Sequence, residues 1–139
     1  MRKSDEIETK QQIGSHLQIF FWRLPKQNHD AMVQFVKQVN NLFAKHGIQP
    51  PEVFQLTNDE GSEDMGFTNI TKAISANQDI EEIWLELHTY RDRKHQDEVD
   101  SIMQNDENAT QLLRQFVNLI TPGSCIEGQF SSIRLSQAK

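Results

Sequence analysis

The sequence predicts an α+β domain in which a four-stranded antiparallel sheet carries its helices on one face. Segments with the two-residue alternation of strands and the three-to-four spacing of helices follow in the order strand, helix, strand, strand, helix, strand. This is the ferredoxin-like βαββαβ order. The length of 139 residues suits one domain, and eight phenylalanines with two tryptophans supply a core although only 36% of the residues are hydrophobic.

The first strand is predicted over residues 17–24, which are rich in aromatic and β-branched side chains and stop at Pro25. Asn28 is predicted to cap the helix that follows, and Gly47, after His46, is predicted to end it. The apolar residues of this helix recur at spacings of three and four and so share one face: Met32, Phe35, Val36, Val39, Leu42 and Phe43.

The middle of the chain is predicted to hold two strands and an irregular segment between them. A short strand over residues 53–56 runs into an acidic loop, residues 58–64. Residues 65–79 are predicted to form a short helix or turn packed on the edge of the sheet. The third strand covers residues 82–90, where one alternating set is Ile83, Leu85, Leu87 and Thr89 and the other is Trp84, Glu86, His88 and Tyr90.

A second helical region is predicted from Asp92, its cap, to residue 120, with a break near Asp106 and a restart capped at Asn108. Pro122 and Gly123 end it, and the last strand is predicted over residues 126–135. The charged residues 1–16 are predicted to be a flexible tail, residues 17–135 to be the single domain, and residues 136–139 to be a C-terminal tail.

Charge and cysteine content exclude several classes of partner. The net charge of −6 is a poor match to a nucleic acid or an anionic membrane surface, so we expect neither as a partner. No apolar run approaches the roughly 18 residues of a membrane span. A single cysteine, Cys125, forms neither an intramolecular disulfide nor a zinc cluster, and we expect a cytoplasmic protein.

Both faces of the predicted sheet carry large apolar side chains. The first strand has Ile19 and Phe21 on one side and Phe20 and Trp22 on the other. Since the helices cover only one face, a second copy of the chain is expected to cover the other, with the two sheets closing into a barrel. The expected partner is therefore the protein itself, as a homodimer.

Several stretches resemble the DUF1428 family of small dimeric α/β-barrel proteins. They are residues 17–47, with the Leu24-Pro25-Lys26 strand end, the Glu82–Leu87 strand, and the closing Glu127-Gly128-Gln129-Phe130. The resemblance implies a dimeric α/β barrel. The wider superfamily includes cofactor-free monooxygenases, haem-degrading enzymes, isomerases and ligand binders, and the resemblance assigns no functional residue.

The candidate site is the strand face that carries Trp84, Glu86, His88 and Tyr90, because residues two apart on a strand lie roughly 6.5 to 7 Å apart and can touch one small ligand. We expect His88 to act as a base or hydrogen-bond donor and Glu86 as its partner or as an acid. Trp84, Tyr90 and Trp22 are expected to contact the ligand. The alternatives are that Glu86 and His88 form a satisfied polar pair on a face turned toward the helices, and that Trp22 only packs in the core.

Other patterns predict no cofactor and no metal. His95, Asp97 and Glu98 lack the spacing of a zinc helix, and the acidic loop lacks the calcium-loop pattern. The function expected first is the binding of a small, partly apolar metabolite in the barrel. The alternative is a cofactor-independent monooxygenase or isomerase acting on a small aromatic or activated-carbon substrate, and a haem-handling protein ranks third.

Overall fold

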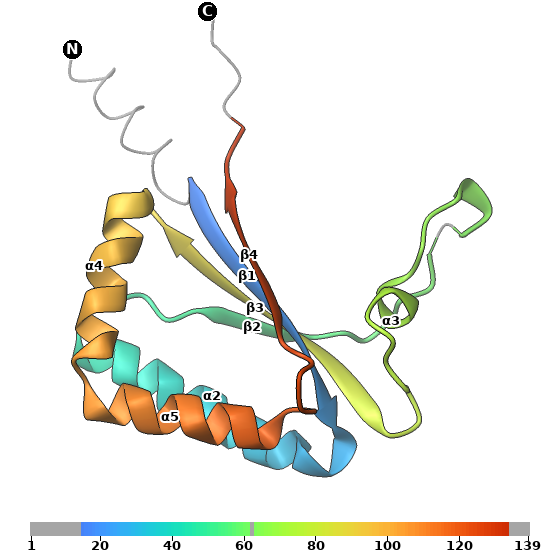
Figure 1. The fold of residues 1–139 in the computed structure, drawn as a ribbon, viewed down its shortest axis with the longest axis horizontal. Coiled ribbons are helices and arrows are strands. Elements are labelled where there is room, and N and C mark those ends of the chain that lie inside the picture. Colours follow the sequence, from blue (N-terminus) through green and yellow to red (C-terminus); the bar gives the residue numbers. More distant parts are fainter. Residues whose placement is uncertain (1–14, 62, 134–139) are drawn as a thin grey trace, which may run out of the picture.

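The computed structural model describes residues 15–61 and 63–133 and shows one antiparallel sheet (Figure 1). Its strands lie in the order β2-β3-β1-β4, which confirms the predicted α+β fold with a four-stranded antiparallel sheet. The strands are β1 (His16–Pro25), β2 (Glu52–Gln55), β3 (Glu81–Tyr90) and β4 (Ile126–Ser131). Residues 1–14 and 136–139, predicted as tails, lie outside the described residues, and β1 includes His16, which the sequence had placed in the tail.

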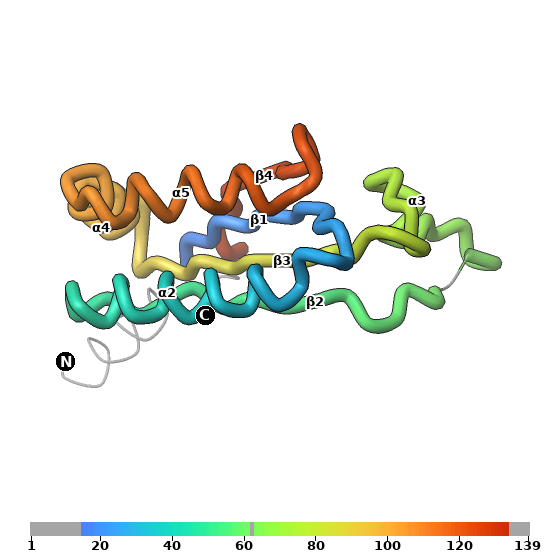
Figure 2. Tube along the Cα trace, turned by 90° about the horizontal axis from the view of Figure 1, so that it is seen from below, coloured from blue at the N-terminus to red at the C-terminus, as the bar shows by residue number. Residues whose placement is uncertain are grey.

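Two long helices, α2 (His29–Lys45) and α5 (Glu107–Leu119), lie side by side along one face of the sheet (Figures 1 and 2). A third, α4 (Arg93–Gln104), follows β3 and meets α5 at the break predicted near Asp106. Between β2 and β3 the chain projects away from the sheet as an arm that carries the four-residue helix α3 (Ile70–Ala73) and a 3₁₀ turn (Glu63–Met65). Residues 65–79, predicted to form a short helix or turn, thus contain one short helix within a mostly irregular segment.

The sheet has a helix face and an open face. Phe20, Trp22 and Leu24 of β1 point to the helices, where Trp22 and Leu24 are almost fully buried. The next set along the same strand, Ile19 and Phe21, points the other way and is half-buried. Exposed apolar side chains of the outer strands border this open face: Phe54, Ile126 and Phe130.

Two predicted helix caps differ from the structure. Asn28 stands before α2, but its side-chain amide donates to the Leu119 carbonyl (2.8 Å) and ties the start of α2 to the end of α5. The cap of α5 is Asp106, which accepts from the Asn108 N–H (2.8 Å), rather than Asn108 itself. The Asp106 carboxylate also pairs with His46 and Lys45 at the end of α2. Its charge therefore stabilises the start of α5 and holds α2 and α5 together.

The last strand ends at Ser131, earlier than the predicted residue 135. Ser131 pairs with His16, the first residue of β1, and the Ser132 N–H still donates to the Ser15 carbonyl (2.8 Å) just beyond the strand. Residues 134 and 135 lie outside the described residues.

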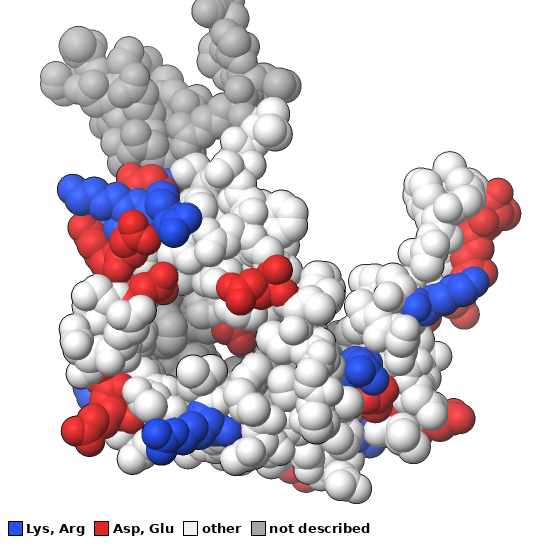
Figure 3. Space-filling view, viewed as in Figure 1, with Lys and Arg blue, Asp and Glu red and all other residues white. Residues whose placement is uncertain are grey.

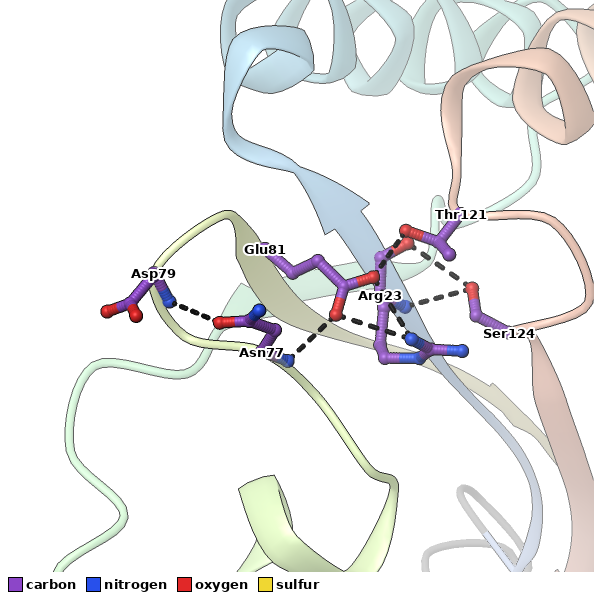
Figure 4. A network of polar contacts seen from close by, with 6 residues as sticks. All are labelled: Arg23, Asn77, Asp79, Glu81, Thr121 and Ser124. Carbon is purple, nitrogen blue, oxygen red and sulfur yellow. Dashed lines mark hydrogen bonds and ion pairs between the residues drawn. The ribbon is translucent and has the colours of Figure 1, made fainter.

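A buried carboxylate links three parts of the chain (Figure 4), at the opposite end of the sheet from α4 (Figure 1). Glu81 accepts hydrogen bonds from the Arg23 guanidinium (3.1 Å), the Thr121 hydroxyl (2.8 Å) and the Asn77 backbone N–H (2.9 Å). Burial raises the pKa of Glu81, but these hydrogen bonds outweigh it and leave the pKa below its usual value. The network fixes the end of β1, the start of β3 and the turn before β4 relative to one another.

Candidate functional site

A cavity of about 330 Å³ lies between the helix face of the sheet and α2, α4 and α5. Its apolar walls are formed by Phe20, Phe35, Val39, Phe43, Val99, Met103, Leu113 and Phe116. Its polar lining consists of Gln18, Glu86, His88, Tyr90 and Asp100. Figure 3 shows the surface hollowed between α4, α5 and the strands, with acidic side chains at the edge of the hollow.

The cavity exists because the two central strands fill only one end of the helix face. Trp22 lies directly opposite Trp84 in the register, and the two indoles stack with centroids 6.3 Å apart. The Trp22 indole also packs edge to face against the ring of Phe116 of α5, with the two ring centroids 4.9 Å apart. Further along, Phe20 faces Glu86, and these two side chains fill less of the space below the helices than two indoles do.

Three side chains of β3 form the polar end of the cavity. The Nε2–H of His88 donates to Glu86, and the Tyr90 hydroxyl lies 3.4 Å from His88 Nδ1. Burial and the nearby carboxylates of Asp100 and Glu86 raise the pKa of Tyr90 far above its usual value, so its hydroxyl keeps its proton at neutral pH. Both imidazole nitrogens of His88 therefore have partners, and the ring is held in one orientation.

A second carboxylate reaches the same end of the cavity from α4. Burial, and after it the charge of Asp97, raise the pKa of Asp100, while the neighbouring His88 opposes the rise. On the β1 side, the Gln18 amide donates to Glu127 (2.7 Å) and its carbonyl accepts weakly from Gln96 (3.4 Å). Asp100 and Gln18 were not predicted from the sequence as site residues. The signal for Asp100 was its place between Val99 and Met103, on the edge of the apolar face of α4.

Residues 15–117 match the family model described as Protein of unknown function (DUF1428). The chain belongs to the DUF1428 family. The match includes every residue that lines the cavity, from Gln18 to Phe116, and stops before β4. No curated protein matches the chain.

In this DUF1428 protein the residues expected at the site separate into two groups. Glu86, His88 and Tyr90 line the cavity. Trp84 and Trp22 lie outside it in the packed core, where the Trp84 indole N–H donates to Glu82 (3.0 Å). All five side chains lie on the face of the sheet that is turned toward the helices of the same chain. The cavity therefore lies within one chain and not between two sheets.

Within residues 15–61 and 63–133, no three His, Cys, Asp or Glu side chains gather as a metal ion would require. No helix in these ranges is both long and apolar enough to cross a membrane.

Proposed function

We propose that this DUF1428 protein binds a small, partly apolar molecule in the cavity between the helix face and the helices. The observation that carries the proposal is a cavity of about 330 Å³ with apolar walls and one polar end. Small-molecule sites have this composition and span roughly 300 to 1,000 Å³. The apolar walls would bury the body of the ligand, and the polar end would orient it.

The orienting groups are Glu86, His88 and Tyr90. Phe20 and Phe43 hold the imidazole from two sides, with ring centroids 5.6 and 6.0 Å from that of His88. A donor group of the ligand would compete with His88 for Glu86. An acceptor group of the ligand would receive a hydrogen bond from the Tyr90 hydroxyl in place of its long contact with His88. The polar end can thus accept either kind of ligand group without a large rearrangement.

The test is calorimetric titration with 2-phenylethanol, a neutral probe with an aromatic body and one hydroxyl. We expect the wild type to bind it and the Met103→Trp variant to lose binding, because the larger side chain fills the cavity from α4. The matched control is Ile102→Trp, the same change at the neighbouring exposed position. Failure of the wild type to bind both this alcohol and the corresponding amine, 2-phenylethylamine, would overturn the proposal, as would equal binding of 2-phenylethanol by the two variants.

A second function, proton abstraction from a small activated substrate, is favoured by the Glu86–His88 hydrogen bond. A carboxylate that holds one imidazole nitrogen leaves the other, Nδ1, as the basic atom, and Nδ1 has only the long Tyr90 contact. This is the chemistry that a cofactor-independent oxygenase or isomerase needs at its first step.

Exchange of the benzylic protons of 1-phenylpropan-2-one in D₂O, followed by proton NMR, tests this second function. The C–H bond breaks, His88 takes the proton, and a deuteron returns to the same carbon. We expect exchange to be faster with wild type than with His88→Gln. Equal rates would exclude the base function and leave the binding proposal standing.

We also propose that the open face is covered by a second copy of the chain. The support is the apolar character of this face on every strand, from half-buried Phe21 and Leu85 to exposed Phe54 and Phe130. Light scattering after size exclusion should give the mass of two chains for wild type and of one chain for Phe21→Asp. Gln34→Asp, at an exposed position of α2, should stay a dimer. A one-chain mass for the wild type would contradict the proposal.

A further inference from the structure

The charged side chains that line the cavity are all acidic or imidazole. Glu86 approaches from β3 and Asp100 from α4, and no lysine or arginine of the described residues lines the cavity. Glu127 of β4 is close enough to contribute to the raised pKa of Asp100. The lining therefore holds two carboxyl groups and one imidazole, and no permanently cationic side chain of the described residues.

The walls add a second feature that favours a positive charge. Phe20, Phe35, Phe43 and Phe116 enter the cavity from three different elements, and Tyr90 closes its polar end. The face of an aromatic ring carries negative potential, and a cation within about 6 Å of it is attracted. Rings on several sides with carboxylates beside them form the environment in which organic cations are recognised.

Hydrogen-bond acceptors also exceed donors here. Among the lining donors, the Gln18 amide already donates to Glu127 and the Nε2–H of His88 already donates to Glu86. Glu86 and Asp100 offer four carboxylate oxygens, of which one is bonded to His88. A ligand that brings hydrogen-bond donors would satisfy this surplus, whereas a carboxylate ligand would add to it.

We infer that the ligand of this cavity is an organic cation, a protonated amine on an apolar body, with its nitrogen between Asp100 and Glu86. The inference rests on the proposed function and adds the chemical class of the ligand. The aromatic walls bury the body, and the carboxylates select the charge. Neutral molecules of the same shape bind more weakly, and carboxylates are repelled.

Three probes that share a phenylalkyl skeleton test the inference by calorimetry at neutral pH: 2-phenylethylamine, 2-phenylethanol and 3-phenylpropionate. We expect the amine to bind about tenfold or more tighter than the alcohol, since a hydrogen bond to a charged group contributes about 1.5 to 3 kcal/mol. We expect no binding of the propionate. Asp100→Asn should reduce the preference for the amine over the alcohol severalfold, because it removes one of the two carboxylates beside the nitrogen and keeps the shape of the side chain.

The matched control is Glu98→Gln, which removes an exposed carboxylate from the same helix and should keep the preference. Equal binding of amine and alcohol by the wild type, or tighter binding of the propionate, overturns the inference and leaves the proposed function standing. Binding of none of the three probes overturns the proposed function itself, and the inference with it.

Discussion

The two ends of the helix face are built differently although the same strands and two of the same helices, α2 and α5, border both. At one end Trp22 and Trp84 lie opposite each other and fill the space below α2 and α5 together with Leu24 and Met32. At the other end the corresponding pairs are Phe20 with Glu86 and Gln18 with His88, and a cavity remains. A shift of two residues along each strand thus leads from a tightly packed pair to a pair that borders a cavity.

The difference shows where this protein places stability and where it leaves room for a ligand. The packed end has complementary aromatic surfaces, and its two indoles and Phe116 are in direct contact. The hollow end keeps partly buried polar groups and unfilled volume, both of which cost stability. A protein that tolerates such a cost at one end of a single core usually does so for function.

The largest expected effect is at the packed end. Trp22→Ala should lower the free energy of unfolding by about 3 to 5 kcal/mol, because the side chain is 1% exposed and its removal leaves a cavity between Trp84 and Phe116. Urea denaturation followed by circular dichroism measures this. A loss below about 1 kcal/mol would mean that this end is not tightly packed.

A matched pair on α2 sharpens the comparison. Both Val36 and Val39 pack against the core cluster, but only Val39 also lines the cavity. Val36→Leu should cost about 1 kcal/mol through overpacking, and Val39→Leu should cost nothing or stabilise slightly because the extra reach enters empty space. The same change on one helix cancels differences in helix propensity. Equal effects in urea denaturation would contradict the contrast between the two ends.

The hollow end is held by charge as well as by packing, and this predicts a pH dependence. Hydrogen bonds from His46 (2.7 Å) and Lys45 (3.1 Å) hold the pKa of Asp106 far below its usual value. A lowered carboxyl pKa stabilises the folded state fully above the unfolded value of about 3.9 and loses that effect as the pH falls toward the folded value.

The melting temperature of the wild type should therefore drop as the pH falls below 4. Asp106→Asn should melt a few degrees lower at neutral pH and lose less on acidification. Thermal denaturation at several pH values measures both, with Asp97→Asn, at an exposed ion pair of α4, as the control. If the melting temperature of Asp106→Asn fell as steeply on acidification as that of the wild type, other carboxyl groups would account for the pH dependence.

Tyr90→Phe should have only a small effect on stability. The variant keeps the ring that packs with Phe43 and Val99 and removes only a hydroxyl with one long contact, so it should cost about 0.5 kcal/mol. It should nevertheless weaken binding of 2-phenylethanol severalfold, because it removes a donor from the polar end. Unchanged affinity in calorimetry would mean that Tyr90 only packs.

The order of the elements and the helix break near Asp106 could be predicted from the sequence, as could the shared strand face of Glu86, His88 and Tyr90. All of these follow from local periodicity and helix capping. It could not say which face meets the helices. Both faces of β1 and β3 carry large apolar side chains, so alternation alone is symmetrical between them.

Two features of the site depend on distant parts of the chain. The stacking of Trp22 on Trp84 follows from the pairing register of β1 with β3, and this register takes both tryptophans out of the cavity. Asp100 reaches His88 only because α4 turns back over the end of the sheet, a packing that the helical pattern of α4 does not contain. Local pattern therefore predicted the strand that supplies the polar end but not the helix that completes it.

The most direct test of the contrast between the two ends is a methyl NMR titration with 2-phenylethanol. We predict shifts at the methyl groups of Val39, Val99 and Met103, which line the cavity, and none at Leu24 and Met32 in the packed end. Shifts confined to the open face, at Ile19 and Leu85, or no shifts at all would contradict the assignment of the cavity as the binding site.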